Sequence, residues 1–241
     1  MPQRIAYLTD LHLDDQYPKD AGADTFRNWE MALQDLTTRT VDKVIVGGDF
    51  GEPSTTSYFF ESLAAYSDLH LTLGNHDQFA NILSHYPRAQ QYQEQGGLYY
   101  SFVEDGYQYI FLDSSSGQVP PAQVEWLQTA LTEAYPILLF IHHPIFGIDD
   151  SLADVMFPLK GRVSLQQILL DSGLDISIFC GHYHLLDEQK QEKVQQFITP
   201  AISVQFDTQA KHIRFHANSF SYRIIEVNKT GIWSELIQFN T

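Results

Sequence analysis

The feature of this sequence that most constrains its fold is a repeated pairing of a short apolar run with polar residues that can bind metals or transfer protons. The clearest case is Leu71-Thr72-Leu73, followed directly by Gly74-Asn75-His76-Asp77. In open α/β folds the C-terminal ends of strands carry the functional groups, and this stretch fits that arrangement. The pattern recurs after apolar runs that end at Thr9, Val46, Ile141 and Cys180.

These apolar runs and the segments between them predict an alternation of strands and helices. Strands are expected over Arg4–Thr9, Val41–Val46, His70–Leu73, Leu98–Val103, Tyr107–Leu112, Ile137–Ile141 and Ile176–Cys180. Helical spacing and breakers predict helices over Asp24–Arg39, Tyr58–Tyr66, Phe79–His85, Pro120–Glu133 and Ser164–Asp171. Pro18 and Gly22 indicate a loop.

After Leu185 the sequence changes character. The runs there are short and favour β structure, and we expect antiparallel strands that complete a sheet over Phe197–Thr199, Ile202–Phe206, Tyr222–Val227 and Ile232–Gln238. Neither an internal repeat nor a linker interrupts the pattern. Residues 1–241 are therefore predicted to form a single α/β domain.

Charge limits the partners of this chain. Lysine and arginine number 14 against 30 aspartates and glutamates, a net charge of −16. Such a field disfavours binding to nucleic-acid polymers and to anionic membranes. A small phosphate ester can still bind, because divalent cations invert the local potential. No apolar stretch is long enough for a spanning helix, the N-terminus does not resemble a signal peptide, and the lone Cys180 favours a cytoplasmic location.

The polar residues at the five strand ends are candidate metal ligands. They are Asp10, His12, Asp49, Asn75, His142, His182 and His184. In Asp-x-His or His-x-His on an extended segment, alternate side chains point the same way and can reach one ion. Preceding glycines at 48, 74 and 181 would let the backbone turn sharply. Mixed oxygen and imidazole ligands favour Mn, Fe or Zn.

Each segment alone is also compatible with a cap, a turn or a structural histidine, but their ordered recurrence favours a metal site. The ordered set resembles the calcineurin-like metallophosphoesterase superfamily, with motifs from Asp10 to His184. Within it, the chain is most similar to bacterial class III cyclic nucleotide phosphodiesterases, on Leu112-Asp113-Ser114, Gln123-x-x-Trp126-Leu127, Thr199-Pro200 and Val204-Gln205-Phe206. It departs from that branch after Asp49, where Phe50-Gly51-Glu52-Pro53 replaces further polar residues, and this leaves the substrate open.

The resemblance implies a four-layer α/β/β/α sandwich, two mixed sheets flanked by helices, with two metal ions at the C-terminal ends of strands. One ion would be held by Asp10, His12, Asp49 and His184, and the other by Asp49, Asn75, His142 and His182. Asp49 would therefore bridge the two ions. His142 is taken as the ligand because the family pattern is His-x-Pro, which leaves His143 at the variable position.

Two ions that share a water can lower its pKa and hold the hydroxide in line with phosphorus. His76 is then the candidate general acid for the leaving oxygen, with Asp77 as the carboxylate that orients its ring. Alternatively, His76 only steadies the oxyanion. Cys180, His70, His85 and His212 are expected to be structural.

Substrate contacts are expected from Asn75 and His76, and from Phe206, Arg214 and His216 in the C-terminal part, although Phe206 and Arg214 also fit structural roles. The favoured function is hydrolysis of a small phosphodiester, such as a 3',5'-cyclic nucleotide. A phosphomonoesterase acting on a nucleotide or sugar phosphate would use the same ligands. A protein-binding scaffold of the same fold would be expected to lack some of them. The oligomeric state, monomer or homodimer, is left open.

Overall fold

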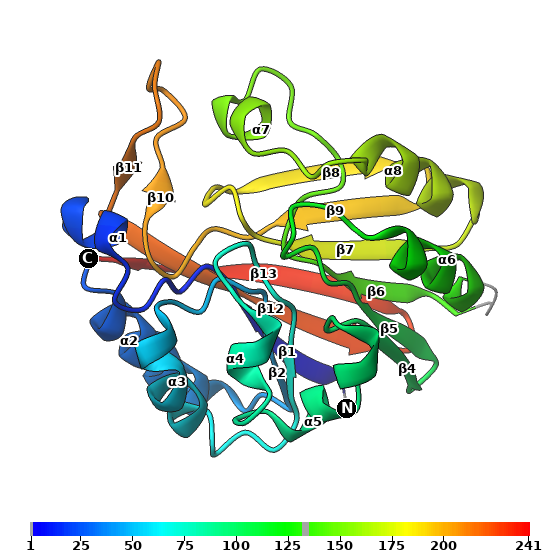
Figure 1. The fold of residues 1–241 in the computed structure, drawn as a ribbon, viewed down its shortest axis with the longest axis horizontal. Coiled ribbons are helices and arrows are strands. Elements are labelled where there is room, and N and C mark those ends of the chain that lie inside the picture. Colours follow the sequence, from blue (N-terminus) through cyan, green and yellow to red (C-terminus); the bar gives the residue numbers. More distant parts are fainter. Residues whose placement is uncertain (1, 132–134) are drawn as a thin grey trace.

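The computed structural model describes residues 2–131 and 135–241, which fold around two β-sheets that face each other (Figure 1). The first sheet has the strand order β13-β12-β1-β2-β3. Its strands are β1 (Gln3–Leu8), β2 (Lys43–Val46), β3 (Leu69–Leu71), β12 (Ser219–Asn228) and β13 (Gly231–Asn240). β1, β2 and β3 run parallel to one another, whereas β12 pairs antiparallel with both β1 and β13, so the sheet is mixed.

The second sheet has the order β4-β5-β6-β7-β9-β8. Its strands are β4 (Tyr100–Glu104), β5 (Tyr107–Phe111), β6 (Ile137–Phe140), β7 (Ile176–Cys180), β8 (Asp187–Gln191) and β9 (Val194–Ile198). The four central strands are parallel and both edge strands are antiparallel. A separate hairpin is formed by β10 (Gln205–Phe206) and β11 (Phe215–His216).

Aromatic side chains fill the space between the two sheets. Tyr7 from β1 lies 5.8 Å from Phe140 of β6, and Phe140 in turn lies 5.0 Å from Phe111 and 5.5 Å from Phe179, measured between ring centroids. These rings are fully buried. Strands covered on both faces are mostly apolar, and β6 is a continuous hydrophobic run, whereas β2 and β7 each contain one polar residue.

Helices cover the outer face of each sheet (Figure 1). The α-helices are α1 (Gln16–Asp20), α2 (Thr25–Arg39), α3 (Thr56–Ser62), α4 (Phe79–Ile82), α5 (Pro87–Gln90), α6 (Pro121–Ala130), α7 (Leu152–Met156) and α8 (Arg162–Asp171). Short 3-10 turns occupy Pro53–Thr55 and Gln93–Gln95. α2 and α3 bury Trp29 and Phe59 in the core of the first sheet, and α6 and α8 bury Leu127 and Leu169 against the second. The expected four-layer architecture is confirmed.

Several local predictions need correction. Residues 16–20 form α1 rather than a loop, because Pro18 lies in the first turn, where a missing N–H costs no hydrogen bond. β9 pairs parallel with β7 instead of antiparallel, and the polar edge strand β8 and the short α7 were not expected. The helix expected over Pro120–Glu133 is seen as α6, and its expected last residues, Thr132 and Glu133, lie outside the described residues.

Among the residues that the structure describes, none of the helices has the length and apolar character needed to span a membrane.

Candidate metal centre

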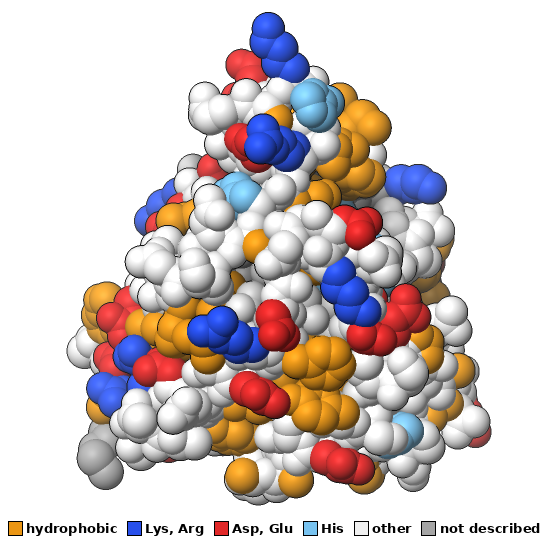
Figure 2. Space-filling view, turned by 90° about the vertical axis from the view of Figure 1, so that its left-hand side faces the viewer, with side chains coloured by type: hydrophobic (Ala, Val, Ile, Leu, Met, Phe, Trp, Pro, Cys, Tyr) orange, Lys and Arg blue, Asp and Glu red, His pale blue; other side chains and the backbone are white. Residues whose placement is uncertain are grey.

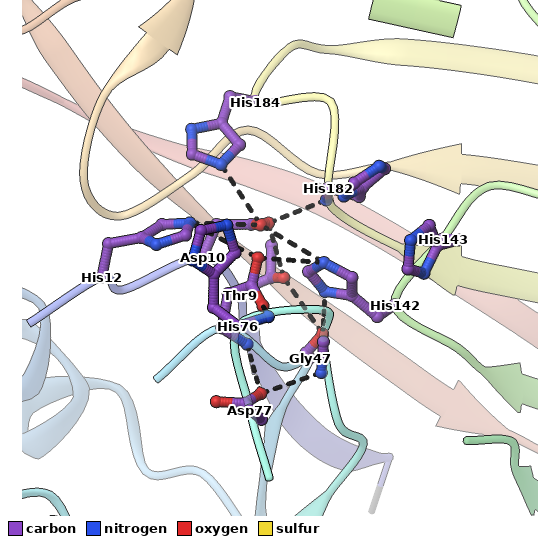
Figure 3. Close-up of polar contacts among 12 residues, drawn as sticks. Thr9, Asp10, His12, Gly47, His76, Asp77, His142, His143, His182 and His184 are labelled. Atoms are coloured by element: carbon purple, nitrogen blue, oxygen red, sulfur yellow. Dashed lines mark hydrogen bonds and ion pairs between the residues drawn. The ribbon is translucent and has the colours of Figure 1, made fainter. Parts of the chain in front are cut away.

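The loops after β1, β2, β3, β6 and β7 meet at one edge of the sandwich, where the parallel strands end (Figure 3). Backbone hydrogen bonds fasten them together: the Asp10 amide donates to the Gly48 carbonyl at 3.0 Å, and the Gly181 amide donates to the His142 carbonyl at 3.0 Å. Each of these bonds joins loops of one sheet, and the His182 amide links the two sheets by donating to Oδ2 of Asp10 at 2.9 Å. The side chains of all five loops point into one space.

Five of the predicted ligands have a left-handed backbone. The φ angles are 56° at Asp10, 47° at His12, 54° at Asp49, 68° at His182 and 51° at His184. The expectation that Asp-x-His and His-x-His lie on extended segments is therefore wrong. Their side chains converge because the chain turns at each ligand, in a conformation that residues other than glycine adopt rarely and at a cost.

Of the three glycines that precede candidate ligands, Gly74 and Gly181 are needed because other atoms lie very close to them, not because the chain turns there. Only Gly48 has a positive φ, of 96°. A Cβ atom on Gly74 would lie 2.1 Å from Oδ1 of Asp49, and one on Gly181 would lie 2.3 Å from Oδ2 of Asp10. Any side chain at these two positions would push a ligand carboxylate out of place.

The first group of ligands surrounds the Asp10 carboxylate. Oδ1 of Asp10 lies 3.3 Å from Nε2 of His184 and 3.9 Å from Nε2 of His12. Oδ2 of Asp10 accepts hydrogen bonds from the Thr9 hydroxyl at 2.7 Å and from the His182 amide at 2.9 Å. Since His184 donates its Nδ1–H to the carbonyl of Val204 at 2.8 Å, its Nε2 is left to face the centre.

The second group surrounds Asp49. Its Oδ2 lies 3.2 Å from Nε2 of His142, which donates through Nδ1 to the Gly47 carbonyl at 2.8 Å. His182 donates through Nε2 to the Phe157 carbonyl at 3.0 Å, which leaves its Nδ1 as the atom available to the centre. Asp49, His142 and His182 each place a ligand atom within 4.8 Å of the others, as do Asp10, His12 and His184.

Asp49 lies between the two groups. Its Oδ2 is 3.5 Å from Nε2 of His12, in the first group, as well as 3.2 Å from Nε2 of His142, in the second. Its other oxygen accepts a hydrogen bond from the amide of His76 at 2.8 Å. One carboxylate is thus held where it faces ligands of both groups.

Unpaired buried atoms show what this centre is suited to hold. Oδ1 of Asp10, Nε2 of His12 and Nε2 of His142 are all buried without a hydrogen-bond partner. A buried polar atom without a partner is costly, and here all three converge on one point. Carboxylate oxygens and imidazole nitrogens are ligands for Mn, Fe and Zn, so the residues fit divalent metal ions.

The electrostatics agree with this donor set. Burial lowers the pKa of His142, but the facing carboxylates of Asp49 and Asp10 outweigh it and raise the pKa to about 10. Burial alone would raise the pKa of both carboxyls, yet the neighbouring histidines, His184 for Asp10 and His142 for Asp49, hold each of them below its ordinary value. The centre therefore keeps two carboxylates ionised and attracts positive charge.

Asn75 stays a predicted ligand, and His143 has partners other than the carboxylates of the centre. Asn75 is exposed and lines the cavity beside Asp49. His143 is buried, makes a hydrogen bond with the Ser114 hydroxyl at 2.9 Å, and packs 4.1 Å from the His182 ring. It supports the neighbouring ligand rather than facing the Asp49 carboxylate.

Asp77 does not orient His76, and that prediction is corrected. Its Oδ2 accepts hydrogen bonds from the amides of Asp49 at 2.6 Å and Gly74 at 2.8 Å, and its Oδ1 accepts from the amide of Phe50 at 3.0 Å. Burial, followed by the nearby Asp49 carboxylate, raises the pKa of Asp77 to about 7. Asp77 fastens the loop after β3 to the loop after β2.

The carboxylate that lies closest to the His76 ring belongs to Asp15, which was not predicted. Oδ2 of Asp15 is 2.7 Å from Nδ1 of His12 and 3.9 Å from Nδ1 of His76. The His76 side chain is 47% exposed, and its ring packs edge-on against His12 with centroids 4.9 Å apart. Asp15 follows the Asp-x-His motif by three residues, and that proximity is the only sequence signal for it.

A cavity of about 200 Å³ opens over the ligands. Of the predicted substrate contacts, Asn75, His76 and Phe206 line it. Arg214 does not: its side chain is 69% exposed, and its nearest charged partner is Asp207, at 3.9 Å. His216 is also outside the lining, so both predictions are corrected.

Tyr17 and Phe215 line the cavity instead, with their rings 5.3 Å apart. Phe215 pairs with Phe206, which also lines the cavity, and because successive side chains of a strand point to opposite sides, His216 is turned away. Tyr17 comes from α1, the helix that the sequence did not predict. The presence of Phe157 from the end of α7 makes the wall largely aromatic.

Comparisons with known proteins agree with this architecture. A family model described as calcineurin-like phosphoesterase matches residues 3–186. A protein of Fibrobacter succinogenes named a probable cyclic nucleotide phosphodiesterase is 24% identical over 99% of this chain and 94% of its own length. A protein of the same description from a Pseudoalteromonas species is 28% identical over 98% of this chain and 94% of its own.

Among solved structures, a dimetal phosphatase from Danio rerio superimposes with a TM-score of 0.69, covers 100% of this chain and 99% of its own, and is 14% identical. At that identity the likeness shows a shared fold. It extends across both sheets and therefore across the strand ends that carry the candidate ligands.

Proposed function

Since this chain belongs to the calcineurin-like phosphoesterase family, we propose that it is a binuclear metal-dependent enzyme that hydrolyses a small phosphodiester. The observation that carries the proposal is the position of Asp49, whose Oδ2 faces His12 at 3.5 Å and His142 at 3.2 Å. A carboxylate held between two groups of ligands is what a two-metal site requires.

The proposed ligands follow the two groups of side chains. One ion would be held by Asp10, His12, Asp49 and His184, and the other by Asp49, Asn75, His142 and His182. Both groups are supported by the proximity of their carboxylate and imidazole atoms, and Asn75 by its place beside Asp49 in the cavity wall. When bound, such ions supply Lewis-acid activation of water and neutralise charge on the phosphate.

The remaining chemistry belongs to side chains of this chain. His76 lies on the cavity wall with a half-exposed ring, where it can donate a proton to the leaving oxygen. Asp15 stands beside Nδ1 of that ring, so Nε2 is the nitrogen turned to the substrate. The His142 and His184 rings are held by backbone carbonyls, which fixes the nitrogen that each presents.

A diester is favoured over a monoester because two curated relatives are named probable cyclic nucleotide phosphodiesterases, and a cyclic nucleotide is the first substrate to test. The aromatic wall supports this choice, since a base can stack on Tyr17 or Phe215. On the face seen in Figure 2, basic side chains lie among acidic ones rather than in one group, which favours a small substrate over a nucleic-acid polymer. The complete set of ligands argues against a non-catalytic scaffold.

We keep the single domain over residues 1–241 and the cytoplasmic location as proposals, the latter because Cys180 is free and buried.

The experiment that tests the function uses protein loaded with Mn²⁺ and bis-p-nitrophenyl phosphate as substrate. We expect hydrolysis by the wild type and a loss of at least about 1,000-fold in Asp49→Ala, which removes the shared ligand. Asp20→Ala, an exposed carboxylate outside the centre, is the matched control and should keep full activity. Full activity in Asp49→Ala would overturn the two-metal assignment.

A substrate panel then separates the two enzyme functions. Cyclic AMP and cyclic GMP represent diesters, and nucleoside monophosphates and sugar phosphates represent monoesters. We expect kcat/KM to be higher for the diesters. A preference for the monoesters would instead establish a phosphomonoesterase with the same centre.

A further inference from the structure

Large apolar side chains are exposed together on the segment that borders the cavity. Val155 is 71% exposed, Met156 is 52% exposed and Phe157 is 43% exposed. We call these three residues the α7 ridge. Two more exposed apolar residues, Val163 at 75% and Leu186 at 54%, belong to α8 and to the segment before β8, and Figure 1 shows α7 standing above β8. Exposed apolar residues that gather at one place usually mark a binding surface.

The α7 ridge is continuous with the cavity. Phe157 belongs to both, and its carbonyl accepts the hydrogen bond from Nε2 of the ligand His182 at 3.0 Å. The buried Asp154 of α7 accepts a hydrogen bond from the hydroxyl of Tyr183, another residue of the cavity wall, at 2.8 Å. Asp154 also forms an ion pair with Arg162. α7 is thus fastened to the wall of the candidate active site.

The cavity is small, so a substrate bound in it can reach the α7 ridge at its border. At about 200 Å³ it is smaller than the roughly 300–1,000 Å³ of pockets that enclose a small-molecule ligand. Any substrate larger than the reacting phosphate and a small substituent must extend past the border. On the α7 side the first surface that it meets is apolar.

We infer that the α7 ridge binds an apolar alkyl or aryl group of the substrate, so that amphiphilic phosphodiesters are preferred over compact polar ones. This inference rests on the proposed phosphodiesterase function and adds the chemistry of the group outside the cavity. A lipid bilayer with an anionic surface is a poor occupant, because the chain carries a net charge of −16. By contrast, a substrate whose phosphate is bound at the metal centre can extend its apolar group directly onto the α7 ridge.

The test uses ethyl, butyl, hexyl and octyl esters of p-nitrophenyl phosphate with the Mn²⁺-loaded protein. The leaving group is the same in all four, so only contacts outside the reacting centre change. We expect kcat/KM to rise about twofold for each added methylene, because a chain that lies on a surface buries roughly half of each methylene. A flat series from ethyl to octyl would overturn the inference.

Variants test whether the dependence of kcat/KM on the length of the alkyl chain comes from the α7 ridge. The double substitution Val155→Ser, Met156→Gln should flatten the dependence on chain length while leaving kcat/KM for the ethyl ester within about twofold, because both side chains are exposed and lie outside the cavity lining. Trp233→Ser on β13, 50% exposed in the wild type, is the control and should keep the full dependence. An unchanged slope in the double variant would place the apolar contact elsewhere and overturn the assignment.

Failure of the proposed function is distinguishable from failure of this inference. If none of the diesters is hydrolysed, the function fails, and the same esters are then used as ligands in calorimetry, where Kd should fall with chain length in the wild type and not in the double variant. A third outcome is that the wild type forms dimers, the double variant is monomeric, and kcat/KM does not depend on chain length. The α7 ridge would then be an interface between copies of this chain, and the inference would be overturned.

Discussion

Oδ2 of Asp15 lies 2.7 Å from Nδ1 of His12, and both side chains are buried. The contact fixes the His12 ring so that Nε2 faces Asp10 and Asp49. Carboxylates that hold the outer nitrogen of a ligand histidine raise its basicity and define its orientation. The same oxygen is 3.9 Å from Nδ1 of His76, so one carboxylate lies beside a candidate metal ligand and the candidate proton donor.

We expect Asp15→Ala to weaken Mn²⁺ binding by about 10- to 100-fold, because the His12 ring loses its acceptor. Asp15→Asn keeps an oxygen acceptor and should lose less than Asp15→Ala. Calorimetric titration of the metal-free proteins with Mn²⁺ measures both, with Asp20→Ala as a control that should match the wild type. Equal affinity in wild type and Asp15→Ala would mean that His12 needs no such support.

The role of His76 is tested through the leaving group. A general acid contributes roughly 100- to 10,000-fold when the leaving oxygen is a strong base and little when it is p-nitrophenolate. We therefore expect His76→Ala to reduce kcat strongly for a dialkyl phosphate and less than about tenfold for bis-p-nitrophenyl phosphate. His212→Ala, an exposed histidine outside the cavity lining, is the control. Equal losses on both substrates would assign His76 to stabilising the oxyanion.

Substitution of Asp77 should lower stability, whereas substitution of His76 should lower activity. Asp77→Ala removes the acceptor of three backbone amides, those of Asp49, Phe50 and Gly74. We expect the free energy of unfolding to fall by about 3 kcal/mol or more, since donors without partners keep their desolvation cost. Urea denaturation measures the loss. The ratio of rates on the two diesters should stay at the wild-type value, and a shifted ratio would return Asp77 to the proton-transfer step.

A pH dependence of stability is expected from His70, far from the metal centre. Burial, followed by the nearby Arg88 and Lys43 charges, lowers its pKa from 6.5 to about 4, although Asp68 opposes the shift. Because protonation then favours the unfolded chain, the contribution of His70 to stability is fully present above pH 6.5 and is lost as the pH falls towards 4. The loss amounts to about 3 kcal/mol.

Comparison of wild type with His70→Gln isolates this effect above about pH 4.5, because Asp68, the carboxyl group whose pKa His70 lowers, stays largely ionised there in both proteins. Urea denaturation in the presence of EDTA should show the wild type losing more stability than the variant between about pH 7.5 and pH 4.5. Parallel pH profiles for the two proteins would contradict the assigned pKa.

The central strands and the positions of the candidate ligands were predictable from the sequence for one physical reason. Parallel strands covered on both faces are largely apolar, so β2, β6 and β7 stand out as mainly apolar runs that end abruptly. Polar residues placed after such runs gather at one edge of a sheet.

The contacts around the ligands were not predictable, because they depend on how separate loops pack. Asp77 accepts a hydrogen bond from the amide of Asp49, 28 residues earlier, and no local sequence pattern predicts that contact. Tyr17 reaches the cavity only because residues 16–20 form a helix. The choice of Phe215 over its neighbours depends on the register of a two-residue strand, and a shift of one position exchanges every side chain between the two faces.

The left-handed backbone at five candidate ligands lowers the stability of the fold at the residues on which the proposed activity depends. Each such residue costs about 1–2 kcal/mol relative to glycine, a residue that cannot bind a metal through a side chain. Glycine at Asp10, His12 or His184 would relieve this backbone cost, but it would also remove the buried hydrogen bonds that each of these side chains makes. The polar contacts of these side chains must therefore offset the backbone cost at the same positions.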